Sequence, residues 1–375
     1  MRWVTITGHI NDKYKYMRQY IGKLVKSSSI GKKIYWYYRL KRDSKKVFEN
    51  FKITDNLEFE FQKIKEANKK YGWLPDEYYL YHYNELTDSK RKSFICEQEH
   101  VEIADFLNTA NARKILGNKW KTYLEYSPFF CRGACCITNT ADNVEKWNDL
   151  FRLFDRCGKL IVKPLDGSFG KGIQIMENVS NKRLLQTRLI TDYPKGFIAE
   201  EIIKQDIRMA VLHEESVNTL RIHTICFDGS VTVFHPYLRI GRGNSVVDNA
   251  GSGGIFTSCN PENGEILSVV DEFGRTFSKH PDTNFQLIGY KVPCWNEAFD
   301  IAQKLALHNS DVHYAGWDLA LTEHGWVLIE GNPRAQFIFQ ISEQKGFRDE
   351  LQTILNKYGK LYKSTYFTEK TLCDI

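Results

Sequence analysis

The stretch GWDLALTEHGWVLIEGN, residues 316–332, decides the fold that this sequence predicts. Alternating runs lie on both sides of the tripeptide EHG, residues 323–325, as in the two strands of a hairpin. Three-residue hairpin loops commonly end with Gly in the left-handed conformation, which suits this tripeptide. The stretch therefore predicts two antiparallel strands, and a loop of these three residues places Asp318 directly opposite Glu330.

The two opposed acidic residues predict a metal site. Directly opposed Cβ atoms lie only about 4.5–5.5 Å apart and like charges there are destabilising, so a cation is expected between Asp318 and Glu330. Asn332 lies two residues further along the same face. Three oxygen-bearing side chains without sulfur or imidazole suit a hard ion, Mg²⁺ or Mn²⁺. The alternative is a solvated sheet face with a lysine neighbour, and a two-residue loop would turn Glu330 to the opposite face.

A glycine-rich loop, KPLDGSFGKGI at residues 163–173, is a candidate phosphate site. It matches neither the P-loop nor the dinucleotide fingerprint. Residues 159–163 and 173–176 predict strands, so the loop joins two strands and lacks a helix N-terminus. Glycines still allow successive N–H groups to turn toward one anion, although a plain turn is the alternative. The candidate phosphate ligands are Lys163, Gly167, Ser168, Gly170 and Gly172.

The remaining patterns predict a mixture of helices and hairpins, and so the α+β class. An Asp-Gly pair at 228–229 between alternating apolar runs predicts a long hairpin over 218–240. Apolar residues at helical spacing predict a helix that starts at Val144 and that Gly158 closes. Residues 1 to about 110 are expected to be mainly helical.

The composition is that of an ordinary globular protein. The 375 residues, 42% hydrophobic and 26% charged, are enough for two or three domains. No apolar run approaches the roughly 18 residues of a spanning helix, and the N-terminus has no signal-peptide pattern. Nine cysteines without framework spacing favour a reduced, cytoplasmic protein. Cys131, Cys135 and Cys136 are interpreted as structural or loop thiols rather than zinc ligands, because a second Cys or His pair is missing.

Positive charge is concentrated at the front of the chain. Residues 1–70 hold 18 Lys and Arg against 7 Asp and Glu, a net charge of +11, so the rest of this +6 chain carries −5. This segment, which also contains Tyr35, Tyr37 and Tyr38, suits either an anionic partner or, as the favoured alternative, a solvated helical face. Nucleic acid is not expected, since no recognised binding motif accompanies the charge.

Together these parts resemble the ATP-grasp superfamily, and most closely its sugar-transfer-associated family, which is alpha-L-glutamate ligase-related. KPLDGSFGKGI, AEEII, NTLRIHT, GWDLAL and LIEGNPR carry the resemblance, which spans roughly residues 105–340. It implies the ATP-grasp fold, in which two α/β lobes grip ATP between antiparallel sheets. The expected regions are a basic, mainly helical N-terminal region (1–105), an N-terminal lobe with the glycine loop (106–196), a C-terminal lobe with the metal site (197–340) and a C-terminal helix (341–375).

The resemblance also implies which residues hold the phosphates of ATP. Lys119, with Lys121 as a rival, would contact the α-phosphate, and Lys163 would lie near the adenine and the α-phosphate. Residues 167–172 would cover the β- and γ-phosphates. Arg221 would contact the γ-phosphate.

The adenine, the ribose and the metal have implied ligands as well. Main-chain groups of Glu200, Glu201 and Ile202 would bind the adenine edge, and Gln205 or Asp206 would lie near the ribose. The implied metal ligands are Asp318, Glu330 and Asn332, and the residues expected to take part in catalysis are Lys163, Arg221 and Arg239.

The function that the resemblance implies is an ATP- and Mg²⁺-dependent ligase. Such an enzyme joins a small carboxylate to an amine or sugar acceptor through an acylphosphate, here in the modification of a glycan or polysaccharide precursor. One alternative is an ATP-grasp kinase that phosphorylates a hydroxyl. Another is a non-catalytic nucleotide-binding module tethered to membrane glycan-assembly machinery. The candidate acceptor region comprises Arg239, Arg242, Asp248, Asn249, Gly253 and Gly254.

Overall fold

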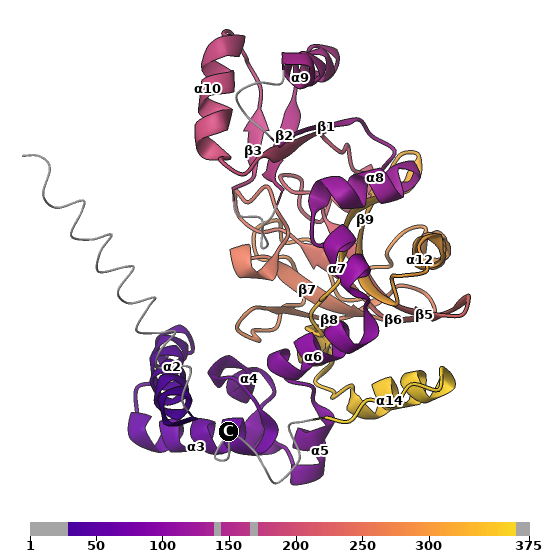
Figure 1. Cartoon of the computed structure of the whole chain (residues 1–375). Helices are drawn as coiled ribbons and strands as arrows, with labels where there is room; N and C mark the ends of the chain where they lie inside the picture. Colours follow the sequence, from indigo (N-terminus) through magenta and orange to yellow (C-terminus); the bar gives the residue numbers. More distant parts are fainter. Residues whose placement is uncertain (1–28, 139–143, 166–171, 365–375) are drawn as a thin grey trace, which may run out of the picture. The chain divides into compact units, whose positions relative to one another are not determined.

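The fold is described from a computed structural model of the chain (Figure 1). The structure describes residues 29–138, 144–165 and 172–364. Three predicted phosphate ligands, Gly167, Ser168 and Gly170, lie outside these residues.

The chain divides into two compact units. Unit 1 contains the described residues up to Glu99, together with Gly346–Glu350 and the residues from Leu361 on. Unit 2 contains His100–Lys345 and Leu351–Lys360. Both predicted sheets and every predicted site residue that the structure describes belong to unit 2.

Unit 1 is helical over its described residues, as predicted for this part of the chain. Trp73 is fully buried, and its ring packs against Tyr71, Tyr81 and Phe94 at centroid distances of 5.2–5.8 Å. Gly72, with φ 76°, ends the helix before it, because this left-handed conformation costs glycine little. The helices are α2 (Ser29–Asn50), α3 (Leu57–Tyr71), α4 (Pro75–Leu80), η1 (Tyr83–Glu85) and α5 (Asp88–Ser93).

A small antiparallel sheet forms one part of unit 2. Its strands lie in the order β1 (Ala134–Ile137), β4 (Phe197–Glu201), β2 (Leu160–Pro164) and β3 (Gln174–Met176). Strands β2 and β3 pair antiparallel, so the prediction that the glycine loop joins two strands is confirmed.

Two helices cover one face of the small sheet, α9 (Val144–Cys157) and α10 (Lys182–Asp192), both at the top of Figure 1. Their residues Trp147, Leu150 and Leu189 are buried against the strands. Gly158 follows α9 with φ 71°, as predicted.

A larger antiparallel sheet forms the other part of unit 2. The predicted Asp-Gly hairpin is confirmed, since Asp228 and Gly229 both have positive φ, at 49° and 76°. The strands lie in the order β10 (Gly325–Asn332), β9 (Tyr314–Thr322), β5 (Thr219–Phe227), β6 (Ser230–Ile240), β7 (Ile255–Cys259) and β8 (Ile266–Asp271).

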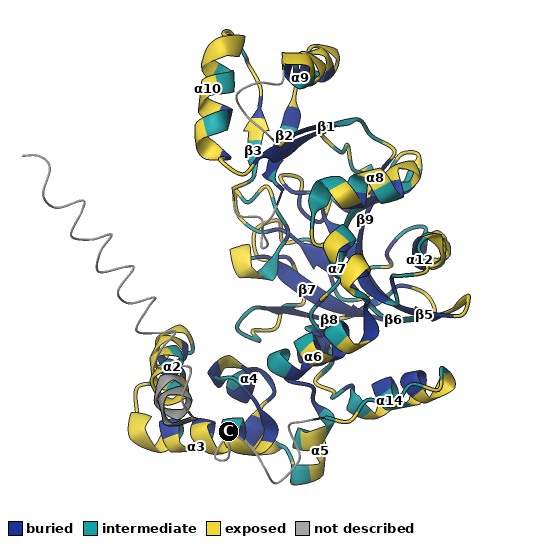
Figure 2. Ribbon diagram, in the orientation of Figure 1, coloured by how far each residue is buried: buried dark blue, intermediate teal, exposed yellow. Residues whose placement is uncertain are grey.

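Three helices pack on one face of this sheet, α7 (Ala110–Leu116), α8 (Lys119–Phe130) and α12 (Trp295–His308). Figure 2 shows that most residues of these strands are buried. Because side chains alternate along a strand, Leu220 and Ile222 face the helices while Arg221 faces the other way. That second face carries the candidate site.

The hairpin at the edge of the sheet corrects the predicted turn. Gly325 pairs with Thr322, so the loop has two residues, and the predicted three-residue loop is wrong. In a regular hairpin, a two-residue loop would turn the Glu330 side chain toward the apolar face of the sheet. A register shift between Leu328 and Glu330 adds one residue to β10, and Asp318 again lies opposite Glu330. The predicted pairing is therefore confirmed, with a bulge in place of the longer turn.

The ends of the ATP-grasp region differ in detail from the expected ones. In place of one helix over 341–375, the described residues form α13 (Phe339–Glu343) and α14 (Arg348–Lys357). Gln344 has φ 49°, which a continuous helix cannot contain. The expected boundary at 105–106 falls inside α6 (Glu97–Leu107). Two short elements complete the described part, α11 (Ile207–Ala210) and η2 (Ala250–Ser252).

Candidate active site

A row of polar side chains crosses the open face of the large sheet. Tyr237 on β6, Arg221 on β5, Asp318 on β9 and Glu330 on β10 are consecutive partners across four neighbouring strands. Opposed residues project on the same side of a sheet, so the four side chains share one face. The fold thus brings together predicted residues that lie more than a hundred positions apart.

Asp318 lies between two arginines. Arg221 donates from Nη2 to Oδ2 at 2.9 Å and from Nε to Oδ1, and Arg239 Nη2 lies 2.9 Å from Oδ2. Burial opposes ionisation of the Asp318 carboxyl, but the two guanidinium groups outweigh it and lower its pKa. In this structure the cationic neighbours of Asp318 are therefore two arginines, and the metal ion expected beside it stays a prediction.

Glu330 has a lysine neighbour from α8. Lys119 opens that helix, and its Nζ lies 3.6 Å from Glu330 Oε1. The rival residue, Lys121, is exposed two residues further on, and its N–H donates to the capping side chain of Asn118. The structure therefore brings Lys119, and not Lys121, to the candidate site.

The three predicted metal ligands lie together. Asp318 and Glu330 are strand partners, and Asn332 Nδ2 lies 3.4 Å from Asp318 Oδ2. Their oxygen donors fit Mg²⁺, which usually takes one or two protein carboxylates and completes its shell with water and phosphate. Among the described residues no group of three or more His, Cys, Asp or Glu side chains could hold a metal. An ion here would therefore depend on phosphate and water oxygens.

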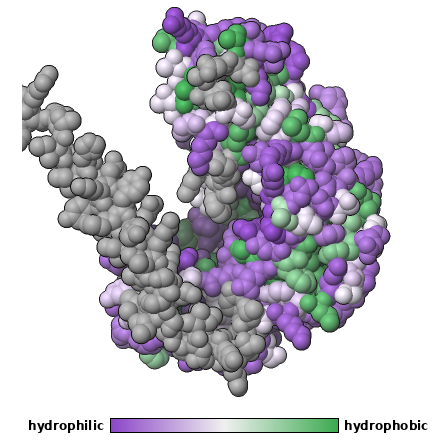
Figure 3. Space-filling view, in the orientation of Figure 1, coloured by the Kyte–Doolittle hydropathy of each residue, from purple (hydrophilic) through white to green (hydrophobic). Residues whose placement is uncertain are grey.

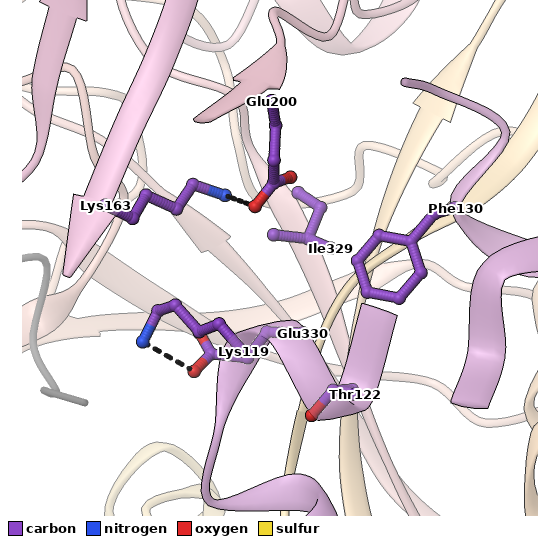
Figure 4. A pocket seen from close by; sticks show the side chains of 7 residues that line it. All are labelled: Lys119, Thr122, Phe130, Lys163, Glu200, Ile329 and Glu330. Carbon is purple, nitrogen blue, oxygen red and sulfur yellow. Dashed lines mark hydrogen bonds and ion pairs between the residues drawn. The ribbon is translucent and has the colours of Figure 1, made fainter. Parts of the chain in front are cut away.

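The small sheet contributes a second lysine. Lys163 on β2 is buried, and its Nζ donates to Glu200 Oε1 on β4 at 3.1 Å (Figure 4). Lys119 and Lys163 both line one cavity. Figure 4 shows the two lysines on the same side of this cavity, with Phe130 opposite. The lining residues are Lys119, Thr122, Phe130, Lys163, Glu200, Ile329 and Glu330.

Glu200 and its neighbour Glu201 project from opposite faces of β4. Burial opposes ionisation of Glu200, yet Arg132 and Lys163 together lower its pKa to about 2. Glu201 accepts hydrogen bonds from Gly133 N–H at 2.8 Å and Arg156 Nη2 at 2.5 Å. Both carboxylates thus have partners within the chain. The expected adenine contact involves the main-chain groups of this segment and stays a prediction.

Arg132 contacts Glu200, which lines the cavity, and the sequence does not predict this contact. It donates from Nε to Glu200 Oε2 at 2.8 Å and from Nη1 to Leu328 O at 2.7 Å. The segment CRGACC was interpreted only for its cysteines. No residue pattern there indicates that the arginine is buried, since its partners lie on strands far along the chain.

The two candidate ribose ligands are both engaged within the chain. Gln205 Nε2 donates to Ser216 O at 2.7 Å, and Gln205 Oε1 accepts from Asn218 N–H at 3.2 Å. Asp206 caps α11 by accepting the Arg208 N–H at 2.8 Å. These contacts are structural, and a ribose contact by either residue stays a prediction.

The candidate acceptor region is held by Arg239. Its guanidinium donates to Thr219 Oγ1 at 2.8 Å and to Asn249 Oδ1 at 3.0 Å. Asp248 is buried and accepts the Thr219 N–H at 3.0 Å. Arg242 has longer ion pairs, 3.6 Å to Asp271 in the closest case. Of the two arginines, Arg239 is therefore the more firmly fixed by the protein.

Two antiparallel sheets, one carrying Lys163 and the other carrying Arg221 opposite Asp318, form the arrangement that the ATP-grasp resemblance implies. The chain belongs to the sugar-transfer associated ATP-grasp family, whose family model matches residues 76–356. No curated protein matches the chain.

Solved structures that the chain resembles include D-alanyl-alanine synthetase A from Vibrio cholerae O1 biovar eltor, at 13% identity and a TM-score of 0.42, with 68% of this chain and 67% of that chain covered. Another is N5-carboxyaminoimidazole synthetase from Staphylococcus aureus complexed with ADP, at 11% identity and a TM-score of 0.41. That match covers 72% of this chain and 60% of the solved chain. A third is L-amino acid ligase from Bacillus licheniformis, at 14% identity and a TM-score of 0.35. That match covers 62% of this chain and 43% of the solved chain. For the latter two, the match spans less than two thirds of the solved chain.

Proposed function

We propose that this protein is an ATP-dependent ligase that activates a carboxylate as an acylphosphate and passes it to an amine or a related nucleophile. The observation that carries the proposal is the convergence of Lys119 and Lys163, from two different parts of unit 2, on one cavity. Arg221 and Arg239 lie on β5 and β6 of the large sheet, where both contact Asp318. Such a group of cations suits a polyphosphate and leaves little covalent work for the protein.

The chain's own residues would act by position and charge. Lys119 and Lys163 would bind phosphate oxygens, and Arg221 would stabilise the charge that develops on the transferred γ-phosphoryl group. Asp318, Glu330 and Asn332 would hold Mg²⁺, which when bound neutralises phosphate charge. Arg221 and Arg239, which contact Asp318, would exchange this carboxylate for a phosphate when the nucleotide binds.

The reaction balances without a side-chain nucleophile. A carboxylate oxygen attacks the γ-phosphorus, the bond to the bridging oxygen breaks, and ADP leaves. The amine then attacks the acyl carbon, loses a proton and displaces phosphate, which keeps the oxygen that came from the carboxylate. The family description supports a sugar-linked acceptor, and Arg242, with its long ion pairs, is the arginine most available to a carboxylate or sugar phosphate.

The test is ADP release by the purified protein across a panel of carboxylates, amino acids and nucleotide-sugars. For any active pair, the carboxylate is labelled with ¹⁸O and the products are analysed by mass spectrometry. We expect ¹⁸O in the released phosphate. A phosphorylated acceptor without label transfer would instead indicate a kinase, and ATP binding without turnover would indicate a non-catalytic module.

The basic helix α2 supports a peripheral contact with an anionic membrane surface as part of this proposal. Lys41, Arg42 and Lys45 are exposed on it, as is Tyr38. In the view of Figure 3 the described surface is mostly hydrophilic. The exposed basic side chains of α2 favour a charge-based contact. Among the described helices, none is both long and apolar enough to cross a bilayer. Co-sedimentation with phosphatidylserine vesicles at two salt concentrations tests this; salt-insensitive binding or none would contradict it.

A further inference from the structure

The loop between α8 and β1 carries a buried arginine that the proposed reaction does not use. The side chain of Arg132 is 6% exposed. Its Nε donates to Glu200 Oε2 at 2.8 Å, and Nη2 contacts the same oxygen. Its Nη1 donates to the carbonyl oxygens of Phe130 at 3.2 Å and Leu328 at 2.7 Å. Arg132 thereby links the central strand β4 of the small sheet to the bulge of β10 in the large sheet.

Among the residues that the structure describes, Glu200 has two cationic neighbours, one on each carboxylate oxygen. Arg132 occupies Oε2, and Lys163 Nζ donates to Oε1 at 3.1 Å (Figure 4). The three side chains carry a net charge of +1. Without Arg132, the remaining pair of Lys163 and Glu200 would be neutral. Because Lys163 lines the cavity, the charge that an anion meets there depends on Arg132.

We propose that Arg132 is a positioning residue for Lys163: it holds the Glu200 carboxylate so that the Lys163 ammonium keeps a net positive charge for a nucleotide phosphate. The inference rests on the proposed function, because the anion is taken to be a phosphate of ATP. Arginine suits this task, since its planar group can make several hydrogen bonds at once and stays charged when buried. A lysine at position 132 would have one ammonium group, which could not bond to Glu200 and to the two carbonyl oxygens with the same fixed geometry.

A purely structural role for Arg132 makes a different prediction. If Arg132 only ties the two sheets together through the Leu328 and Phe130 carbonyls, removing the charge of Glu200 cannot compensate for its loss. If Arg132 instead keeps Glu200 from neutralising Lys163, replacing Glu200 by neutral glutamine restores the charge at Lys163. A double-mutant cycle separates the two roles.

The first measurement is the affinity of ATP with Mg²⁺, by calorimetry. Arg132→Met is expected to weaken binding about tenfold or more, the size of one charge-assisted contact. The double variant Arg132→Met/Glu200→Gln is expected to recover to within about threefold of the wild type. Arg156→Met is the matched control, since Arg156 pairs with the neighbouring Glu201 on the other face of β4 and is 66% exposed. Its affinity should stay within about twofold of the wild type.

The second measurement needs no nucleotide. Acetylation of Lys163 by a limiting amine-reactive reagent is followed by mass spectrometry. We expect the labelling rate to fall about threefold or more in Arg132→Met, because Lys163 then remains the cationic partner of Glu200 among the described residues, and to return in the double variant. If the wild type binds no ATP, the proposed function fails, while the labelling series still decides the role of Arg132.

Each result decides the proposal. Unchanged labelling in Arg132→Met, or no recovery in the double variant, overturns it. If Arg132→Met does not fold, Glu200→Gln alone decides: affinity and labelling equal to or above the wild type support the proposal. An affinity loss of more than about tenfold with unchanged labelling would show that Glu200 serves the nucleotide directly, and so overturns it.

Discussion

Arg221 on β5 lies directly opposite Asp318 on β9 and bonds to both oxygens of its carboxylate. The pair is buried, since Asp318 is 2% exposed and Arg221 7% exposed. A buried pair of this kind is costly to break from one side, because the remaining charge loses its partner. Asp318 is also a predicted metal ligand, so the same carboxylate that pairs with Arg221 would bind Mg²⁺.

Asp318→Asn is expected to abolish the Mg²⁺ dependence of nucleotide binding. A neutral amide binds Mg²⁺ more weakly than a carboxylate does, while Arg221 and Arg239 become free for phosphate. We expect ATP affinity in EDTA to be retained or increased, and ADP release to fall about 100-fold or more. Calorimetry with and without Mg²⁺ and a coupled ADP assay measure the two effects.

The control for this variant is Asp155→Asn. Asp155 is exposed and pairs with Lys182 at 2.7 Å, away from the cavity. Its variant should bind ATP and release ADP as the wild type does. An Asp318→Asn protein with an unchanged Mg²⁺ response would refute the assignment of Asp318 as a metal ligand.

Lys163→Ala is expected to weaken ATP binding about tenfold to a hundredfold and to remove ATP-dependent phosphate release. The fold should persist, because Glu200 keeps Arg132 as its partner. Lys159→Ala, four residues earlier in the chain, is the control; Lys159 is 63% exposed and pairs with Glu177. Nucleotide affinity is measured alongside circular dichroism, and equal affinities in the two variants would place the nucleotide elsewhere.

The hairpin at 316–332 shows how far the sequence predicts this site. Alternation and the Gly at the turn correctly predict two paired strands, and the opposition of Asp318 and Glu330 is correct as well. The loop length is wrong by one residue, and the bulge after Leu328 compensates for it. The sequence shows no sign of the bulge, because its position depends on packing against neighbouring strands and not on the local pattern.

The partners of the site residues could not be predicted from the sequence. Arg239 reaches Asp318 because β6 lies two strands from β9, and strand order is a property of the whole fold. Arg132 reaches Glu200 and the Leu328 carbonyl for the same reason. The residue types thus predicted which charged groups are present in the site. Which of these groups contact one another depends on tertiary structure.

Gly331→Ala is expected to destabilise the protein by about 1–3 kcal/mol, as overpacking in a core does. An added Cβ would come within 2.8 Å of Trp317 Cζ3 and 2.9 Å of Leu116 Cδ2. Trp317→Phe removes the first of these contacts, so the substitution should cost less in that background. Urea unfolding of the four proteins of this cycle gives the coupling, and additive effects would contradict the predicted clash.

The stability of the protein should also depend on the charge state of Glu200. Its pKa lies near 2, below the ordinary 4.5, because Arg132 and Lys163 outweigh the effect of burial. A carboxyl with a depressed pKa in the folded state stabilises that state above its unfolded pKa and loses this contribution as the pH falls through the folded value. A shift of this size corresponds to about 3 kcal/mol.

We therefore expect the free energy of unfolding of Glu200→Gln to lie furthest below that of the wild type above about pH 5, and the difference to shrink as the pH falls toward 2. Glutamine cannot titrate, so the change with pH comes from the wild-type carboxylate. Urea unfolding between pH 7 and pH 3 measures the difference. Glu323→Gln, at the exposed hairpin turn, is the control and should follow the wild type throughout. A difference that stays constant with pH would show that Glu200 is not held as an ion by Arg132 and Lys163.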